Sequence, residues 1–190
     1  EDVMKGGQGA PLVPIGDRHL FADYPICLNI GGIANVSYEY EGKRIAYDIC
    51  IANQMLNYLA NKLGYDYDNN GSFARQGKVN LDLLKAFNDN SYYDKEAPKS
   101  LGREFFEKYQ HQIIEESSLD VRDILATATE HIASQIVKST DMLEKSKMLI
   151  TGGGAKNNYL VERISELSKH EVVIPDSIII DYKEALIFAF

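Results

Sequence analysis

A triple-glycine motif and the asparagine that follows it have the residue types and spacing for phosphate or nucleotide chemistry. Gly152, Gly153 and Gly154 follow the apolar run 148–151, and Asn157 stands just before the next helical pattern. Glycines between a strand and a helix let a nucleotide come close to the backbone, whose N–H groups can bind phosphate. A tight strand-to-helix turn has the same composition. On this motif alone, the two interpretations are about equally supported.

A second glycine turn and an aspartate extend the same chemistry. Gly31 and Gly32 join two strand-like segments, and a turn of this kind can also present N–H groups to phosphate. Asp48 ends the third such segment, just before a helical pattern that starts near Asn53. A carboxylate in that position can project into a cleft and act as a general base. An ordinary hairpin and a helix-capping aspartate are the structural alternatives.

The elements that position these residues follow from the hydrophobic period. Residues 26–30, 34–40 and 43–48 are β-branched and aromatic segments separated by glycine turns, which predicts an antiparallel meander. A 3.6-residue period predicts a helix from Asn53 to Gly64 and a long one within 119–143. We also expect a polar connection over 65–78, helices over 79–88, 102–116, 158–168 and 182–190, and strands over 148–151 and 171–175. This order predicts an α/β fold with a mixed sheet that starts with the three-strand meander and carries helices on its faces.

Composition and charge exclude several classes of protein. The 190 residues carry 20 Lys and Arg against 28 Asp and Glu, a formal net charge of -8. Because no basic stripe offers the cluster that displaces counterions from nucleic acid, we expect no nucleic-acid partner. No apolar run approaches a membrane span, and Cys27 and Cys50 lack metal or disulfide spacing. We therefore expect a cytoplasmic protein, with one domain over 1–190 and no metal held by its own side chains.

Both ends of the sequence predict that the chain is part of a longer protein. It begins at Glu1 without Met, and it finishes on the apolar run 185–190 without a residue that would close a helix. A site that is shared with another part of that protein would be incomplete within these residues.

Five strings, in their order along the chain, resemble the anhydro-N-acetylmuramic acid kinase family. They are GGQGAPLVP over 6–14, LNIGGIAN over 28–35, PKS and GRE within 98–104, GGG with Asn157, and the pair Glu184-Ala185. The resemblance covers essentially the whole chain. It implies an RNase H-like, actin-like sugar-kinase fold of two domains with ATP in the cleft between them. This chain would be the second domain, and an N-terminal domain would be its missing partner.

The resemblance also implies a reaction. The family is an ATP-dependent kinase that adds water to open the 1,6-anhydro bridge of an amino sugar and phosphorylates O6. The product is N-acetylmuramic acid 6-phosphate, formed during recycling of the bacterial cell wall. Asp48 matches the aspartate of the family's DTGPGN string, which implies that it takes a proton from the attacking water. Mg²⁺ would neutralise charge between the phosphates.

The same resemblance implies roles for further residues. The nucleotide would lie against Gly31, Gly32 and Asn35, and against Gly152, Gly153, Gly154 and Asn157. The candidate sugar-binding residues are Asn53, Lys99, Ser100 and Arg103, and bracing of the cleft is the alternative for the last three. Whether the protein forms a homodimer is left open by the sequence.

The chain departs from the family pattern in three places. The DTGPGN string reads Asp48-Ile49-Cys50-Ile51-Ala52-Asn53, Leu101 replaces the threonine of PKSTGRE, and the GTSxDG string of the first phosphate loop is absent. Larger residues restrict the backbone after Asp48, and these residues alone are not expected to complete an ATP site. A kinase-like protein that binds sugar or a partner without turnover is therefore the alternative. A further alternative, a dinucleotide-dependent oxidoreductase, is supported only by the triple glycine and Asp176.

Overall fold

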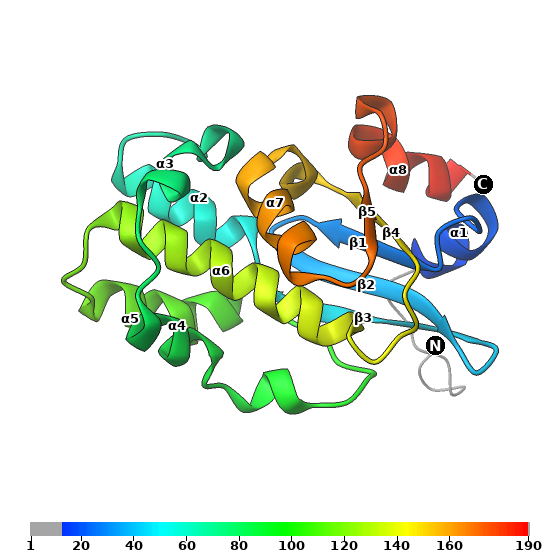
Figure 1. Ribbon diagram of the computed structural model, residues 1–190, viewed down its shortest axis with the longest axis horizontal. Coiled ribbons are helices and arrows are strands. Elements are labelled where there is room, and N and C mark those ends of the chain that lie inside the picture. Colours follow the sequence, from blue (N-terminus) through cyan, green and yellow to red (C-terminus); the bar gives the residue numbers. More distant parts are fainter. Residues whose placement is uncertain (1–12, 190) are drawn as a thin grey trace.

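A five-stranded mixed sheet runs through the computed structural model, which describes residues 13–189 (Figure 1). The strands are β1 (Ile26–Ile30), β2 (Ile33–Tyr40), β3 (Lys43–Ile51), β4 (Lys147–Thr151) and β5 (Glu171–Val173). Their order in the sheet is β3-β2-β1-β4-β5, with β2 antiparallel to β1 and β3, and with β4 parallel to β1 and β5. The predicted mixed sheet and its opening meander are confirmed. Most of the GGQGAPLVP string lies outside the described residues.

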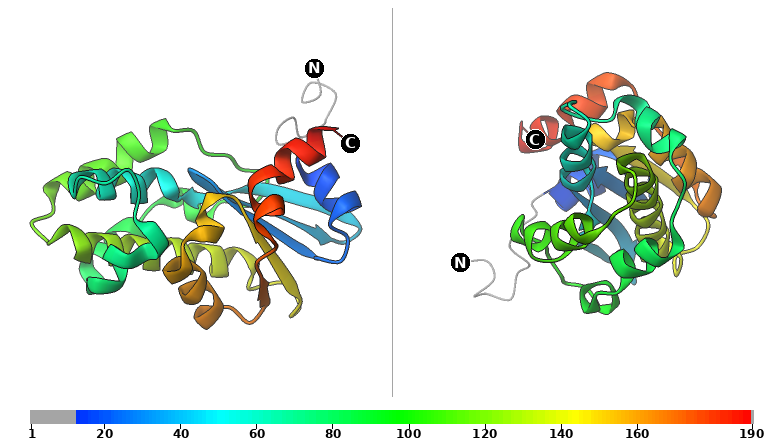
Figure 2. Two further views of the ribbon diagram at one scale, coloured as in Figure 1. Left: turned by 90° about the horizontal axis from the view of Figure 1, so that it is seen from above. Right: turned by 90° about the vertical axis from the view of Figure 1, so that its left-hand side faces the viewer.

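Helices cover both faces of the sheet (Figures 1 and 2). They are α1 (Val13–Leu20), α2 (Asn53–Lys62), α3 (Ser72–Gln76), α4 (Leu81–Asn88), α5 (His111–Glu116), α6 (Val121–Thr140), α7 (Asn158–Leu167) and α8 (Ser177–Ala189). On the face of α6 and α7, Leu28 and Ile132 are fully buried in the main core. On the opposite face, Cys27, Leu149 and Ile187 form a smaller core with α1 and α8. Within residues 13–189, no helix has both the length and the apolar character to cross a membrane.

A buried ion pair fastens α8 to α1. Lys183 Nζ lies 2.7 Å from Asp17 Oδ1, and the two side chains are 4% and 5% exposed. The Ser37 hydroxyl of β2 donates a hydrogen bond of 2.5 Å to the other carboxylate oxygen of Asp17. Removing one member of such a pair leaves an uncompensated buried charge, which is costly. The three side chains therefore link α1 to α8 and to β2 of the sheet.

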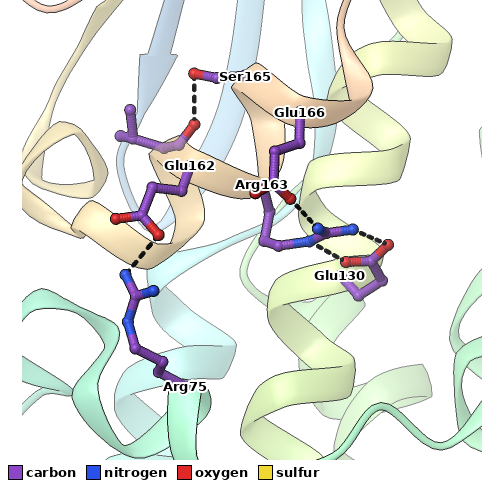
Figure 3. A network of polar contacts seen from close by, with 7 residues as sticks. Arg75, Glu130, Glu162, Arg163, Ser165 and Glu166 are labelled. Atoms are coloured by element: carbon purple, nitrogen blue, oxygen red, sulfur yellow. Dashed lines mark hydrogen bonds and ion pairs between the residues drawn. The ribbon is translucent and has the colours of Figure 1, made fainter.

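A network of charged side chains fixes α7, the helix that follows the triple glycine (Figure 3). Arg163 of α7 donates to both carboxylate oxygens of Glu130 in α6, at 2.8 and 3.0 Å. Arg163 also pairs with Glu166, and Arg75 of α3 donates to Glu162 of α7 at 2.6 Å. The middle of α7 is therefore tied to two neighbouring helices, α3 and α6.

The structure differs from the predicted boundaries at both ends of the described chain. Residues 13–20 form α1, which the sequence did not indicate because Gly16, in its middle, is a weak helix former. A Cβ at Gly16 would overlap the side chain of Ile187, so α1 owes its place to close packing on α8. The last helix begins at Ser177 and not at residue 182.

Two inner segments also differ from the prediction. The helix expected over 102–116 is a π-helix, Phe106–Gln110, followed by the short α5. The connection 65–78 holds a 3-10 turn, Asn69–Gly71, and then α3. Asp68 stabilises α3, because its carboxylate accepts the N–H groups of Phe73 and Ala74 at 2.9 Å each.

His131 is a buried neutral group in the middle of α6. Its Nδ1 lies 2.7 Å from Asn88 Oδ1, and its Nε2 lies 3.3 Å from the Tyr93 hydroxyl. Because the amide oxygen can only accept, the ring donates from Nδ1 and accepts at Nε2. Burial lowers the pKa of His131 from 6.5 to about 3.

We predict that this histidine makes the free energy of unfolding fall on acidification. Between pH 6.5 and 3 the unfolded chain binds the proton that the folded chain excludes, so the stabilisation is complete only above pH 6.5. At about 1.4 kcal/mol per pH unit, the loss between pH 6.5 and 5 is about 2 kcal/mol. Urea unfolding at pH 7 and pH 5 measures it, with His131→Gln as the matched variant. An equally steep pH dependence in the variant would contradict the assignment.

Candidate active site

A row of polar side chains crosses the sheet at the end where both glycine turns lie. Asn29 in β1 pairs with Asn35 in β2, and Asn35 pairs with Asp48 in β3. On its other side, Asn29 pairs with Thr151 in β4. Residues that pair directly share one face of a sheet, and strands lie about 4.8 Å apart. Asp48 therefore lies about 10 Å from Asn29, two strands away, on the same face of the sheet.

The end of β3 is bulged next to this aspartate. Asn35 pairs with Asp48, whereas the next residue along β2, Ala34, pairs with Cys50. Ile49 is thus the extra residue of a β-bulge. Bulges bend a strand and redirect its side chains, and they are common beside active sites. The strand continues to Ile51, so the prediction that it ends at Asp48 is wrong by three residues.

Residues 97–101, which we call the edge loop, hold Asp48 from the outer edge of β3. The Leu101 N–H donates to Asp48 Oδ2 at 2.9 Å, and the Asp48 N–H donates to the Lys99 carbonyl at 3.2 Å. The Tyr92 hydroxyl donates to the Asp48 carbonyl at 2.6 Å. Partial burial raises the pKa of the Asp48 carboxyl, and this effect exceeds the opposite effect of the Leu101 hydrogen bond. The carboxylate is half-buried, a setting suited to a base.

The triple glycine packs directly against the end of β1. Gly152 has a φ of +80°, and a Cβ there would lie 2.5 Å from Asn29 Oδ1 and 2.8 Å from the Ile30 carbonyl oxygen. A Cβ at Gly154 would overlap the Ile30 side chain. Gly153 has room for a side chain, since the nearest atom to its Cβ position is 3.6 Å away. Two of the three glycines are therefore required by close packing, whereas Gly153 has room for a side chain beside Asn53.

The first glycine turn and the start of α2 belong to the same unit. The carbonyls of Gly31 and Gly32 accept the N–H groups of Asn53 and Ala52, at 3.1 and 2.8 Å. The side-chain amide of Asn53 donates to the Ile30 carbonyl at 3.1 Å. Both glycine turns thus meet at Ile30, the last residue of β1.

A cavity of about 430 Å³, which we call the glycine-loop cavity, opens beside Gly153. Its lining includes Asn53, Lys156 and Asn157, and the ring of Tyr67 stands beside it, 61% exposed. Asn157 also caps the start of α7, because its Oδ1 accepts the backbone N–H of Leu160, three residues further on, at 3.1 Å. Amide side chains both donate and accept hydrogen bonds, and an exposed ring can stack. The cavity is therefore suited to a flat, polar group such as a nucleobase.

The remaining candidates do not join the Asp48 carboxylate. The Lys99 ammonium lies over the rings of Tyr47 and Tyr92, 5.3 and 5.0 Å from their centres, on the opposite face of the sheet. Ser100 and Arg103 are exposed. Among residues 13–189, no cluster of acidic, histidine or cysteine side chains is arranged to hold a metal ion.

Three residues of the site were missed by sequence reasoning. Asn29 and Thr151 belong to the polar row, and Tyr67 belongs to the glycine-loop cavity. A polar residue near the end of an otherwise apolar strand is the signal that could have found Asn29 and Thr151. For Tyr67, which lies in an irregular connection, the sequence holds no comparable signal.

This sheet and its glycine turns define a domain of the actin-like ATPase and sugar-kinase class. A solved structure, the activator of the 2-hydroxyisocaproyl-CoA dehydratase from Clostridium difficile with bound ADPNP, has a similar fold. The TM-score is 0.58 at 18% identity, over 92% of this chain and 62% of that one. Within the class, the chain belongs to the anhydro-N-acetylmuramic acid kinase family, whose model matches residues 1–190.

Individual relatives agree with this assignment. The anhydro-N-acetylmuramic acid kinase of Actinobacillus pleuropneumoniae is 35% identical over 203 residues, and that of Gloeobacter violaceus is 38% identical over 204 residues. The matches cover 100% and 99% of this chain but only 55% and 54% of those proteins. The chain thus spans about half the length of these relatives. The predicted family and fold are confirmed, whereas the place of the chain as a second domain stays a prediction.

We predict that neighbouring glycines of the triple-glycine turn respond differently to alanine. Gly152→Ala should lower the free energy of unfolding by at least about 2 kcal/mol, because the backbone is strained and the Cβ meets Asn29. Gly153→Ala, the matched control, should change it by less than about 1 kcal/mol, since its Cβ meets nothing closely. Urea unfolding of the two variants measures the difference. Equal stabilities would show that the turn does not need the conformation described.

Proposed function

We propose that this chain carries the catalytic base and one wall of the nucleotide site of an ATP-dependent anhydro-sugar kinase. The reaction opens the 1,6-anhydro bridge of 1,6-anhydro-N-acetylmuramic acid with water and phosphorylates O6, in the cytoplasm, during cell-wall recycling. The observation that carries the proposal is the polar row, which sets Asp48 on the same sheet face as Asn29, the residue that abuts Gly152. An N-terminal domain outside this chain would close the cleft.

The nucleotide part of the proposal rests on the glycine-loop cavity. Its volume of about 430 Å³, the room beside Gly153 and the amides of Asn53 and Asn157 fit a nucleoside. The dehydratase activator of similar fold is bound to ADPNP, which supports a nucleotide here. Bound ATP with Mg²⁺ supplies the phosphoryl group that O6 receives. Mg²⁺ in phosphoryl-transfer sites is usually held by substrate phosphates, water and one or two carboxylates.

The chemical part of the proposal rests on Asp48. In its ionised form the carboxylate takes one proton from a water molecule, whose oxygen forms a bond to C1 of the sugar. The C1–O6 bond breaks as this happens. O6 would then bond to the γ-phosphorus of ATP while the bond from that phosphorus to the β,γ-bridging oxygen breaks and ADP leaves. Leu101 orients the carboxylate through Oδ2, which leaves Oδ1 for the water.

The departures from the family string after Asp48 do not favour the alternative of a binding protein without turnover. Cys50, Ile51 and Ala52 are each 0% exposed, so their side chains fill the core and not the sugar side. Beyond the bulge at Ile49, Cys50 and Ile51 continue β3 and pair with β2. The larger residues therefore leave the carboxylate accessible.

We predict that Asp48→Asn in the full-length protein binds the anhydro sugar but turns it over at least about 100-fold more slowly, as expected for loss of a general base. The asparagine oxygen can still accept the Leu101 N–H, so the fold should be kept. Coupled ADP release measures turnover, and calorimetry measures sugar binding. Asp82→Asn, at an exposed position of α4, is the control. Near-normal turnover in Asp48→Asn would remove the assigned base.

The same residue predicts the acid side of the pH profile. Because burial raises the pKa of Asp48, turnover of the full-length protein should fall on acidification at a higher pH than an ordinary aspartate with a pKa of 3.8 would give. Above that pKa the carboxylate is ionised and active. Turnover measured from pH 4 to 8 gives the pH at which the acid side of the profile falls.

We further predict that Tyr67 contributes to nucleotide affinity. Tyr67→Ala should weaken ADP binding to the full-length protein about two- to tenfold, the range expected for loss of one stacking contact. Tyr65→Ala is the matched control, because Tyr65 is similarly exposed, at 56%, but lies outside the cavity lining. Calorimetric titration with ADP tests both. Equal ADP affinities in the two variants would show that the adenine ring does not stack on Tyr67.

A further inference from the structure

A second cavity lies on the sheet face opposite to the Asp48 carboxylate. We call it the tyrosine–lysine cavity. It has a volume of about 460 Å³, within the range of small-molecule sites. Its walls include Tyr47 of β3 and Tyr93, which are 7% and 6% exposed. Tyr40 of β2, 49% exposed, stands at its rim. The cavity thus offers rings against which a flat group can pack.

Positive charge gathers in the same cavity, although the chain as a whole carries a net charge of -8. Lys95, Lys99 and Lys138 contribute to its lining, together with one carboxylate, that of Glu96. Lys138 is paired with Asp94 at 3.0 Å, whereas Lys99 forms no ion pair within the described residues. The cavity therefore retains a positive charge that attracts an anion.

Lys99 is the lysine best placed to receive that anion. Its ammonium has three donors, and the hydrogen bond it makes within the described residues is to the Tyr92 carbonyl at 3.3 Å. Burial lowers the pKa of Lys99, and the nearby charges of Lys138 and Lys95 lower it further. A bound anion would relieve both effects.

We propose that the tyrosine–lysine cavity binds a small organic anion that carries a flat ring, with the ring against Tyr40 and Tyr47 and the anionic group at Lys99. This site is separate from the glycine-loop cavity, with which it shares no lining residue. It lies beside the edge loop, whose Lys99 carbonyl and Leu101 N–H hold Asp48. An occupant would thus contact the segment that positions the proposed base.

The test is a calorimetric titration of the full-length protein with phenyl phosphate, performed with saturating ADP to block the glycine-loop cavity. We expect saturable binding of one molecule per chain. Lys99→Gln should weaken it at least about tenfold, because a charged hydrogen-bonding partner is lost. Tyr40→Ala should weaken it several-fold, and since this ring stands at the rim, the variant should keep its fold. Lys78→Gln, at an exposed position outside the cavity, should bind as the unchanged protein does.

Two further arms separate the parts of the ligand. Inorganic phosphate alone and phenol alone should each bind more weakly than phenyl phosphate if ring and anion are both recognised. Thermal unfolding of each variant verifies folding. The proposal is overturned if phenyl phosphate does not bind with ADP present, if phosphate alone binds as tightly, or if folded Lys99→Gln and Tyr40→Ala both keep full affinity.

Discussion

The hydrogen-bond register between β2 and β3 is the constraint on which the candidate site depends. Successive side chains of a strand alternate between the two faces of the sheet. A slip of one residue would therefore turn Asp48 toward the main core and Tyr47 toward the face that carries Asn29. The register is held because both outcomes are costly: Tyr47 is buried, and a carboxylate in its place would lose its water. The bulge at Ile49 lets β3 continue into α2 without disturbing the pairing at Asp48.

The fold was predictable where one periodic pattern extends over many residues. The meander, α2 and α6 follow from alternation or from a 3.6-residue period, and their positions agree with the structure. The sequence did not indicate α1, because Gly16 opposes a helix, and the contacts that compensate for it, with Ile187 and between Asp17 and Lys183, are long-range. The π-helix Phe106–Gln110 is likewise set by its surroundings, since no local pattern distinguishes it from an α-helix.

The residue types of the candidate site were predictable from the sequence, but the sheet face to which each side chain points was less so. The two glycine turns do meet, and Asp48 does lie on the same sheet face as Asn29. Register alone reveals that Asn29 belongs to the row, and register is a property of strand pairs that a single segment does not encode. Lys99 lies two residues from Leu101, yet its side chain passes to the other face of the sheet while its carbonyl stays at Asp48. The edge loop therefore serves both faces.

The pair formed by Asp17 and Lys183 has an evolutionary consequence. Replacing one of the two residues by a neutral one would leave the other as an unpaired buried charge, so the two positions should change together in evolution. Relatives that carry a neutral residue at one of them should carry a neutral residue at the other as well. A correlation between two sites near opposite ends of the chain would thus record, in sequence alone, that α1 and α8 touch.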